Sequence, residues 1–421
     1  MPYYLKKITM ENDCGLLTFN PELLLGDRLD IVLYTFCAEQ FLFDGDVAKA
    51  EALYGKFLAR FPNENKEHSF ANFRELAASI QEKGFDPYCP VVVNPKLFFL
   101  ENGSHRCAIS IALGIKSIPY SMTFLNNCVP YEKYLKIFSS NELDFLFHLQ
   151  TQYIQRIEDG NRVACLMRTH ALKNQKDFNS LFSSLNVANA TLFYQGDKSR
   201  NISGKRDCRG RFERYGLQKF LKNTDVALEF GCNIGIFSSI VAANIFKLYG
   251  YDINETYIEL ARKYSSEIGV NNTVFNVGDV KDVKPERKFS VIISCAVHGW
   301  SGLSFSDYCH VLLSHAEKGA IILFESHEIL SDTQWRQKKN VLLSFCDCLQ
   351  SGFIDDIDHS LYSSEIREFL ILKVKDNPVV PNEPCDNVCQ TSLFSKIVNK
   401  IKMHIPQSIK EIIKKFFWRY S

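Results

Sequence analysis

Residues 227–237 read ALEFGCNIGIF, and this stretch decides the fold of the second half of the chain. An apolar run ends in a glycine-rich turn that carries Glu229, Gly231, Asn233 and Gly235, and a second apolar run follows. This pattern predicts a buried strand, a tight turn and the first turn of a helix. Glycines let the backbone approach a ligand closely, and a helix start offers unpaired N–H groups. The spacing does not fit the G-x-G-x-x-G loop of nicotinamide-binding proteins.

Apolar segments after this stretch recur at intervals that suit alternating strands and helices. The predicted strands are Lys247–Asp252, Thr273–Val277, Phe289–Cys295 and Ala320–Phe324. Helices are expected over Glu255–Tyr264 and Thr333–Leu349, and the segments Gly352–Ser360 and Glu368–Val374 suit a closing antiparallel pair. Polar residues follow each of the four strands, as expected at the carboxyl edge of a doubly wound α/β sheet.

In this context the pattern E-x-G-x-N-x-G resembles motif I of the class I S-adenosylmethionine (SAM) methyltransferases. The resemblance implies a Rossmann-like class I sheet and SAM as the cofactor. An acid at the end of the second strand can accept the ribose hydroxyls. Family members hold the adenine amino group where Gly278-Asp279-Val280 stands here. The implied cofactor-binding residues are Glu229, Gly231, Asn233, Gly235, Asp252, Asp279 and Val280.

Candidate catalytic residues follow the fourth and fifth strands. Methyl transfer needs in-line positioning and, for a neutral hydroxyl acceptor, a base. His298 is the first candidate base and His327 the second, and Glu325 could orient either imidazole. A histidine that only bonds a loop carbonyl is the alternative. The N-P-P-Y tetrad of amine methylation is absent after the fourth strand.

The acceptor is expected near the same loops. The H-G-W and E-S-H segments are similar to those of methyltransferases whose acceptor is a sugar hydroxyl or a terminal phosphate. For an anionic phosphate no base is required, and cationic side chains would act as electrostatic clamps. Trp300 could cover the acceptor or cap the core. The methionine carboxylate or an anionic acceptor could bind to Arg206, Arg211 and Arg214, with helix Arg211–Leu221 as a lid; a solvated basic helix face explains them equally well.

The first part of the chain predicts a smaller α+β domain over residues 15–128. Its expected helices are Asp30–Phe43, Asp46–Phe61, Phe70–Lys83 and Ser104–Leu113, and its expected strands are Val91–Asn94, Leu97–Glu101 and Ser117–Phe124. Ser104 is a good N-cap residue, which places His105 and Arg106 beside free backbone N–H groups in a first helical turn. This arrangement favours an anion, best a phosphate.

The turn Gly103-Ser104-His105-Arg106 resembles the G-x-H-R turn of the ParB/sulfiredoxin-like domains. The resemblance implies a phosphate- or nucleotide-binding site, and ATP with Mg as a possible second cofactor for phosphotransfer. Many family members carry an acid where Asn102 stands here, and this departure weakens the case for metal-assisted catalysis. A binding-only module and a purely structural use of His105 and Arg106 are the alternatives.

Other segments complete the predicted organisation. Residues 129–200 are expected to form a helical connector, 201–375 the methyltransferase domain and 376–392 a linker rich in Pro, Asn and Asp. In residues 393–421, two basic amphipathic helices are expected, because seven cations and one acid, Glu411, alternate with apolar residues. Such a tail favours an anionic membrane surface. Docking on the protein's own body or on a partner groove is the alternative.

Composition narrows the class of protein further. The net charge of +1 argues against general nucleic-acid binding, and the 14 cysteines show no convincing zinc spacing, so no metal site is predicted. Without a secretory start or an apolar stretch of spanning length, reduced thiols in a cytoplasmic protein are expected.

Together these features predict a SAM-dependent methyltransferase attached peripherally to the inner membrane. Its expected acceptor is a sugar hydroxyl or terminal phosphate of a membrane-associated or lipid-linked glycan, and its N-terminal domain could be a kinase acting on the same acceptor. The competing prediction is a SAM-binding regulatory or scaffold protein with a non-catalytic ParB-like domain.

Overall fold

The protein is described here by a computed structural model. It describes residues 6–7, 17–26, 28–59, 69–94, 99–122, 134, 136–173, 193–202, 204–283, 287–326, 333–355 and 366–381. The chain divides into two compact units, Met1–Pro378 and Val379–Ser421. The predicted tail helices and most of the predicted linker lie outside the described residues. None of the described helices is long and apolar enough to cross a membrane.

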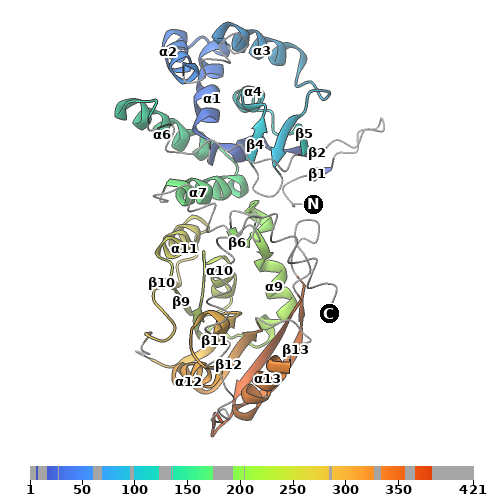
Figure 1. The fold of residues 1–421 in the computed structure, drawn as a ribbon, viewed down its shortest axis with the longest axis vertical. Coiled ribbons are helices and arrows are strands. Elements are labelled where there is room, and N and C mark those ends of the chain that lie inside the picture. The colour runs from blue at the N-terminus through green and yellow to red at the C-terminus, as the bar shows by residue number, and fades with distance from the viewer. Residues whose placement is uncertain are drawn as a thin grey trace, which may run out of the picture. The chain divides into compact units, whose positions relative to one another are not determined.

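A seven-stranded sheet organises the second half of the first unit (Figure 1). Its strand order is β10-β9-β8-β11-β12-β14-β13. The strands are β8 (Val226–Phe230), β9 (Lys247–Asp252), β10 (Thr273–Val277), β11 (Phe289–Cys295), β12 (Ala316–Glu325), β13 (Cys346–Ile354) and β14 (Arg367–Val374). The five strands from β10 to β12 pair in parallel, and β14 runs antiparallel to both of its neighbours. The predicted Rossmann-like α/β sheet is confirmed.

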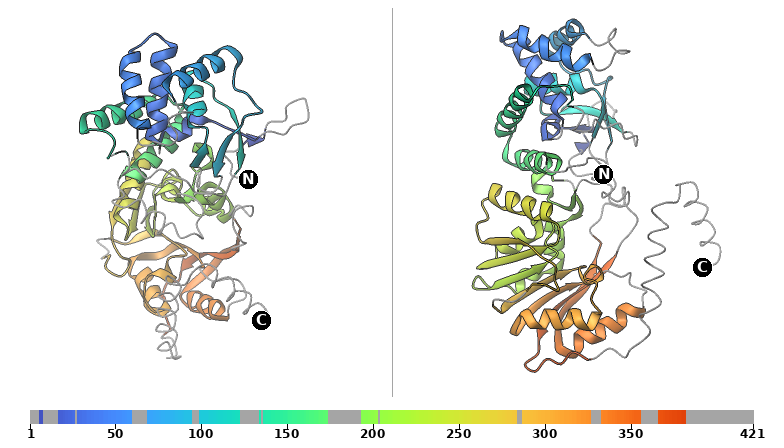
Figure 2. Two further views of the ribbon diagram at one scale, coloured as in Figure 1. Left: turned by 45° about the horizontal axis from the view of Figure 1, so that its top comes forward. Right: turned by 60° about the vertical axis from the view of Figure 1, so that its left-hand side comes forward.

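Helices cover both faces of this sheet (Figure 2). One face carries α9 (Cys208–Tyr215), α10 (Ile236–Ala242) and α11 (Glu255–Glu267), and the other carries α12 (Phe305–His315) and α13 (Thr333–Phe345). All five side chains of β8 are buried, as expected for a parallel strand covered on both faces. The β8–α10 connection therefore lies at the carboxyl edge of the sheet, where ligands bind in open α/β folds.

The closing strands differ from the predicted ones. The helix expected over Thr333–Leu349 ends at Phe345, and β13 begins at Cys346 rather than at Gly352. Cys346 pairs with Val374 of β14. The sequence of residues 346–349 continues the apolar spacing of a helix, but strand pairing with β14 determines its structure. Similarly, the helix expected over Arg211–Leu221 begins at Cys208 and ends at Tyr215, where Gly216 adopts a left-handed φ of 60°.

The N-terminal part combines helices with a five-stranded sheet of order β1-β2-β5-β3-β4. The helices are α1 (Leu29–Leu42), α2 (Val47–Leu58), α3 (Phe70–Lys83) and α4 (Ser104–Ala112). The strands are β1 (Lys6–Lys7), β2 (Leu17–Phe19), β3 (Val91–Asn94), β4 (Phe99–Asn102) and β5 (Ile118–Met122). Sequence patterns predicted three of these strands but not β1 and β2, which are too short to show an alternation of side chains.

The predicted helical connector is only partly helical. Its helices are α6 (Ser140–Gln155) and α7 (Asp159–Lys173), but Phe193–Gly196 forms strand β6. Strand β6 pairs in parallel with β7 (Gly204–Asp207). Because β7 leads directly into α9, residues 193–200 belong structurally with the second domain.

Gly235 offers a test of how tightly the turn before α10 is packed. It has φ of 70°, and a Cβ atom there would lie 2.7 Å from Ala261 Cβ and 2.9 Å from Phe275 Cζ. Gly269 has φ of 73° but has nothing within 4 Å of such a Cβ, so Gly269→Ala tests the backbone strain alone. We expect Gly269→Ala to lower the free energy of unfolding by about 1–2 kcal/mol. Gly235→Ala adds an overpacking cost of about 1–3 kcal/mol.

Urea titration of the two variants measures this difference. Equal losses in both would contradict the close packing of Gly235 on α11 and β10.

Candidate functional site

The loop after β8 is tied to the end of β9 by backbone hydrogen bonds. The carbonyl oxygen of Tyr251 accepts from the N–H groups of Gly231 and Cys232, at 2.8 and 3.0 Å. Gly231 has φ of 68°, and a Cβ atom there would lie 2.7 Å from Val297 Cγ2. Asn233 also adopts a positive φ, of 52°. The loop thus needs a glycine at 231 both for its backbone conformation and for its approach to the loop after β11.

Asp252 closes the other side of this connection. Its two carboxylate oxygens accept the backbone N–H groups of Asn233 and Asn254, each at 2.9 Å. Burial nevertheless raises the pKa of Asp252, and the backbone N–H groups oppose that rise. The carboxylate therefore lies fixed at the strand end and reaches the cavity described below.

Glu229 is the most deeply buried acid of the loop. Ser238 Oγ donates to its Oε2 at 2.6 Å. Burial raises the pKa of Glu229 from its ordinary value of 4.5 to about 7, although Ser238 and the Arg211 guanidinium act to lower it. A carboxyl group with a pKa near neutrality responds strongly to any charge placed next to it.

The Gln195 side chain of β6 also fixes the loop after β8, a role that the sequence patterns did not predict. Its Oε1 accepts from the N–H of Ile236 at 2.9 Å, and its Nε2 donates to the carbonyl oxygen of Cys232 at 3.2 Å. The side chain thus satisfies backbone groups at the start of α10 that no intrahelical bond can satisfy. No local pattern signals this role, because β6 precedes the loop by some 40 residues in the chain.

A cavity of about 790 Å³ opens beside these groups. Six of the seven predicted cofactor-binding residues line it: Glu229, Gly231, Asn233, Asp252, Asp279 and Val280. Gly235 is not among its lining residues, because it packs against Ala261 and Phe275. Unpredicted lining residues include Tyr194, Gln195, Lys205, Tyr257 and Arg367.

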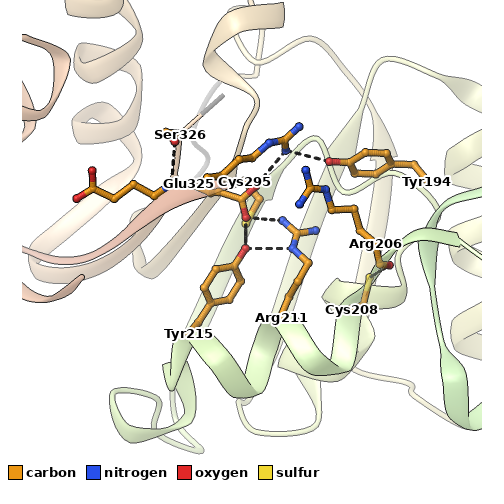
Figure 3. A network of polar contacts seen from close by, with 10 residues as sticks. Tyr194, Arg206, Cys208, Arg211, Tyr215, Cys295, Glu325 and Ser326 are labelled. Carbon is orange, nitrogen blue, oxygen red and sulfur yellow. Dashed lines mark hydrogen bonds and ion pairs between the residues drawn. The ribbon is translucent and has the colours of Figure 1, made fainter. Parts of the chain in front are cut away.

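Glu325 lies at the centre of a buried network on one side of this cavity (Figure 3). Its Oε2 accepts from Arg211 Nη2 at 2.7 Å and from the Tyr215 hydroxyl, and its Oε1 accepts from Arg367 Nη1 at 3.1 Å. Despite burial, the surrounding guanidinium groups lower the pKa of Glu325 to about 2. A carboxylate held this strongly in its ionised form does not serve as a base. Both oxygens bind arginine, and the predicted orientation of an imidazole by Glu325 stays a prediction, because His327 lies outside the described residues.

The candidate base His298 does not face the cavity. Its ring packs against Phe305, Phe324 and Tyr308, with ring centroids 5.4, 5.3 and 6.2 Å away, and it is not among the cavity-lining residues. Val297 and Trp300 on either side do line the cavity, because the short 3₁₀ helix His298–Trp300 turns its first side chain toward the core. His327, the second candidate, lies outside the described residues.

The other predicted acceptor residues have separate locations. Trp300 is 78% exposed at the cavity. Arg211 lines the cavity, and Arg206 lies fully buried in the network around Glu325 (Figure 3). Arg214 is exposed and donates to the carbonyl oxygen of Asp355, away from the cavity lining. Arg367, which was not predicted, lines the cavity, because β14 runs antiparallel to β12 and therefore begins at the carboxyl edge of the sheet.

The predicted phosphate turn is built differently from the expectation. Gly103, with φ of 98°, is the N-cap of α4, and Ser104 is the first helical residue. The Ser104 hydroxyl accepts from Arg28 Nη2 at 3.1 Å, and Arg106 donates to the carbonyl oxygens of Cys89 and Pro90.

The His105 ring packs edge-on against Tyr34, with centroids 4.3 Å apart, and its Nε2 lies 3.3 Å from the Tyr54 hydroxyl. The turn exists, but these side chains hold the domain together.

No cluster of three or more His, Cys, Asp or Glu side chains among the described residues could hold a metal ion.

Comparisons with known proteins concern the second half of the chain. Residues 227–313 match the family model Methyltransf_25, described as a methyltransferase domain. No curated protein matches the chain significantly. Residues 227–313 are therefore similar to a methyltransferase domain, in the half of the chain where the sequence predicted one.

Solved structures resemble the chain at low identity. The N-methyltransferase NodS from Bradyrhizobium japonicum WM9, in complex with S-adenosyl-L-homocysteine, has 12% identity and a TM-score of 0.34, and the match covers 39% of this chain and 86% of NodS. A SAM-dependent methyltransferase from Geobacter sulfurreducens has 14% identity and a TM-score of 0.32, covering 40% of this chain and 91% of its own. Similarity at this level does not identify a cofactor or a substrate.

The raised pKa of Glu229 makes stability depend on pH. The folded protein holds a proton that an unfolded chain releases near pH 4.5, so its stabilisation is complete below that pH and is lost as the pH rises through about 7. The Glu229→Gln substitution keeps the shape of the side chain but removes the group that titrates. We expect its unfolding free energy to rise relative to the wild-type protein between pH 5 and 8.5, by up to about 3 kcal/mol.

Thermal unfolding at a series of pH values tests this expectation. The exposed Glu213→Gln variant is the control and keeps a constant difference from the wild-type protein. A Glu229→Gln difference that stays flat over this range would contradict the burial of an ionisable carboxyl in the loop.

Proposed function

We propose that this protein is a SAM-dependent methyltransferase. The observation that carries the proposal is the junction of the β8 loop with the end of β9, where a glycine turn and the Asp252 carboxylate meet at one cavity. This junction lies within residues 227–313, which match a methyltransferase family. A glycine turn that leads into a helix, followed by an acid at the next strand end, suits a nucleoside ligand.

The residues present fit this cofactor chemically. Asp252 offers carboxylate oxygens for the ribose hydroxyls, and Asp279 and Val280, where the family resemblance places the adenine, line the same cavity. The buried Oδ1 of Asn233 has no hydrogen-bond partner within the described part of the chain. Buried acceptors require donors, and the ammonium group of a methionine moiety supplies them. Glu229 adds a carboxyl whose ionised form a cationic ligand favours.

The chain's own contribution to methyl transfer is positioning. When bound, SAM would supply a methyl group attached to a sulfonium. A lone pair of the acceptor would form the new bond to the methyl carbon while the carbon–sulfur bond breaks and the sulfur becomes a neutral thioether. None of the described residues lining the cavity is a histidine. Cys295 lies at the cavity, but burial raises the pKa of its thiol well above the neutral range. Glu229, whose pKa is about 7, is then the lining group best suited to act as a base, and an anionic acceptor would need none.

We further propose that the acceptor belongs to a glycan displayed at a membrane surface. Support comes from the sequence of residues 393–421, a basic amphipathic tail, which lies outside the described residues. ATP-dependent phosphotransfer is not part of the proposal, because Ser104 and Arg106 already bind other groups of the N-terminal domain.

Cofactor binding provides the direct test. We expect the full-length protein to bind SAM and S-adenosylhomocysteine, and Asp252→Ala to weaken both by roughly tenfold or more, since a charged group loses its hydrogen-bonded ligand. Isothermal titration calorimetry gives the dissociation constants. Asp282→Ala, on an exposed side chain outside the cavity lining, is the control. A folded wild-type protein that gives no heat with either compound would refute the proposed function.

The membrane proposal has its own test. We expect the full-length protein to sediment with vesicles containing phosphatidylserine and to remain in solution with pure phosphatidylcholine vesicles, because anionic lipid attracts basic segments. Removal of residues 393–421 should abolish sedimentation. Equal sedimentation of the shortened and full-length proteins would show that the tail is not the attachment.

A further inference from the structure

Tyr194 lines the cavity, and no residue of the described part of the chain accepts its hydroxyl proton. The side chain comes from strand β6, and its hydroxyl accepts a hydrogen bond from Arg367 Nη1 at 3.0 Å (Figure 3). A phenolic hydroxyl can donate one hydrogen bond as well as accept. The Tyr194 side chain makes no other hydrogen bond or ion pair with the described residues. Its O–H group is therefore available to a ligand in the cavity.

The bond from Arg367 makes this O–H group a stronger donor. A hydroxyl that accepts from a guanidinium group becomes polarised, and hydrogen bonds linked in a chain strengthen one another. Arg367 is itself held in place, because Nη1 also donates to Glu325 Oε1 at 3.1 Å. A hydrogen bond to an ionised oxygen is stronger than one to a neutral oxygen. A carboxylate is therefore the acceptor that suits the Tyr194 hydroxyl best.

Strand β6 brings Tyr194 close to the loop after β8. The next residue, Gln195, binds the carbonyl oxygen of Cys232 and the N–H of Ile236, which lie on either side of Asn233 in the chain. The buried Oδ1 of Asn233 is the acceptor proposed for the ammonium group of the cofactor. An amino acid carries its ammonium and carboxylate groups on one carbon atom. A donor to that carboxylate must therefore come from a segment near Asn233, as β6 is.

The Tyr194 hydroxyl also lies on the appropriate side of this loop. Strand β9, which ends at Asp252, is one neighbour of β8 in the sheet. Arg367 begins β14, which lies on the other side of β8, beyond β11 and β12. Because the hydroxyl contacts Arg367, it lies toward the strand ends opposite to Asp252. A cofactor whose ribose binds Asp252 has its amino-acid end to place on this side.

We propose that the Tyr194 hydroxyl donates a hydrogen bond to the carboxylate at the amino-acid end of the cofactor. Tyr194 is then a positioning residue, because fixing the amino-acid end helps to hold the sulfonium in line with the acceptor. The inference rests on the proposed function, since it concerns the cofactor of the same cavity. It assigns the carboxylate to a tyrosine, whereas the sequence patterns pointed to arginines.

Two matched ligands isolate this hydrogen bond in the full-length protein. S-Adenosylhomocysteine and decarboxylated S-adenosylhomocysteine share the adenosine, the thioether and the amine, but only the first has a carboxylate. Calorimetry gives both dissociation constants, with the decarboxylated ligand measured by displacement where its binding is weak. We expect Tyr194→Phe to weaken S-adenosylhomocysteine binding roughly tenfold or more, because a hydrogen bond to a charged group is lost. Binding of the decarboxylated ligand should stay nearly unchanged.

A second tyrosine provides the matched control. Tyr249→Phe removes a hydroxyl from β9, outside the cavity lining, and should leave both dissociation constants unchanged. Tyr194→Phe also removes one acceptor of Arg367, so a general disturbance of the side chains around Glu325 has to be recognised. Such a disturbance would weaken both ligands alike, whereas loss of the proposed bond affects only the ligand with a carboxylate. Urea unfolding midpoints show whether each variant is folded.

The outcomes distinguish this inference from the proposed function. A loss of affinity in Tyr194→Phe that is confined to S-adenosylhomocysteine supports the inference. Equal weakening of both ligands, or no change in either, would overturn it. A wild-type protein that binds the two ligands equally tightly would overturn it as well, and this comparison needs no variant. If the folded wild-type protein binds neither ligand, the proposed function fails and the inference fails with it.

Discussion

The carbonyl oxygen of Tyr251 accepts two backbone N–H groups, and the rest of the site depends on this shared acceptor. The bonds from Gly231 and Cys232 hold the turn after β8 against the end of β9. The next residue of β9, Asp252, then receives the N–H of Asn233. Two neighbouring strand ends thus become one rigid edge, and the side chains that line the cavity start from it. Backbone groups supply the two bonds at Tyr251, and the side chains of Asp252 and Gln195 bind further backbone groups of the same turn.

A second constraint operates at the other end of the cavity. There the Glu325 carboxylate joins α9 to β14 through Arg211 and Arg367, and Arg367 also donates to the Tyr194 hydroxyl of β6. Buried ion pairs add little net stability on average, because desolvation offsets their attraction. Their value here lies in geometry, since they place several donors around one cavity. The two sides of the cavity differ accordingly: Asp252 and Gly231 line it near β8 and β9, and Arg211 and Arg367 line it near β12 and β14.

Local patterns in the sequence were enough for much of this fold. Strands β9, β10 and β11 have the predicted boundaries because each is a short apolar run bounded by turn residues. Six residues that line the cavity could be named because they sit on one turn and two strand ends. Gln195 and Arg367 could not, because their roles arise from pairing between segments far apart in the chain. His298 was misjudged for a different reason: a strand end indicates the position of a residue but not the direction of its side chain.

The order in which the network is assembled follows from its antiparallel strand. Glu325 precedes its partner Arg367 by 42 residues. A ribosome therefore completes the five parallel strands, and with them the turn after β8 and the end of β9, before Arg367 leaves the exit tunnel. Until then Glu325 has only the partners supplied by earlier segments, and the far end of the cavity lacks one of its walls. A chain that stops before Arg367 would hold the edge formed by β8 and β9 yet lack one wall of the cavity.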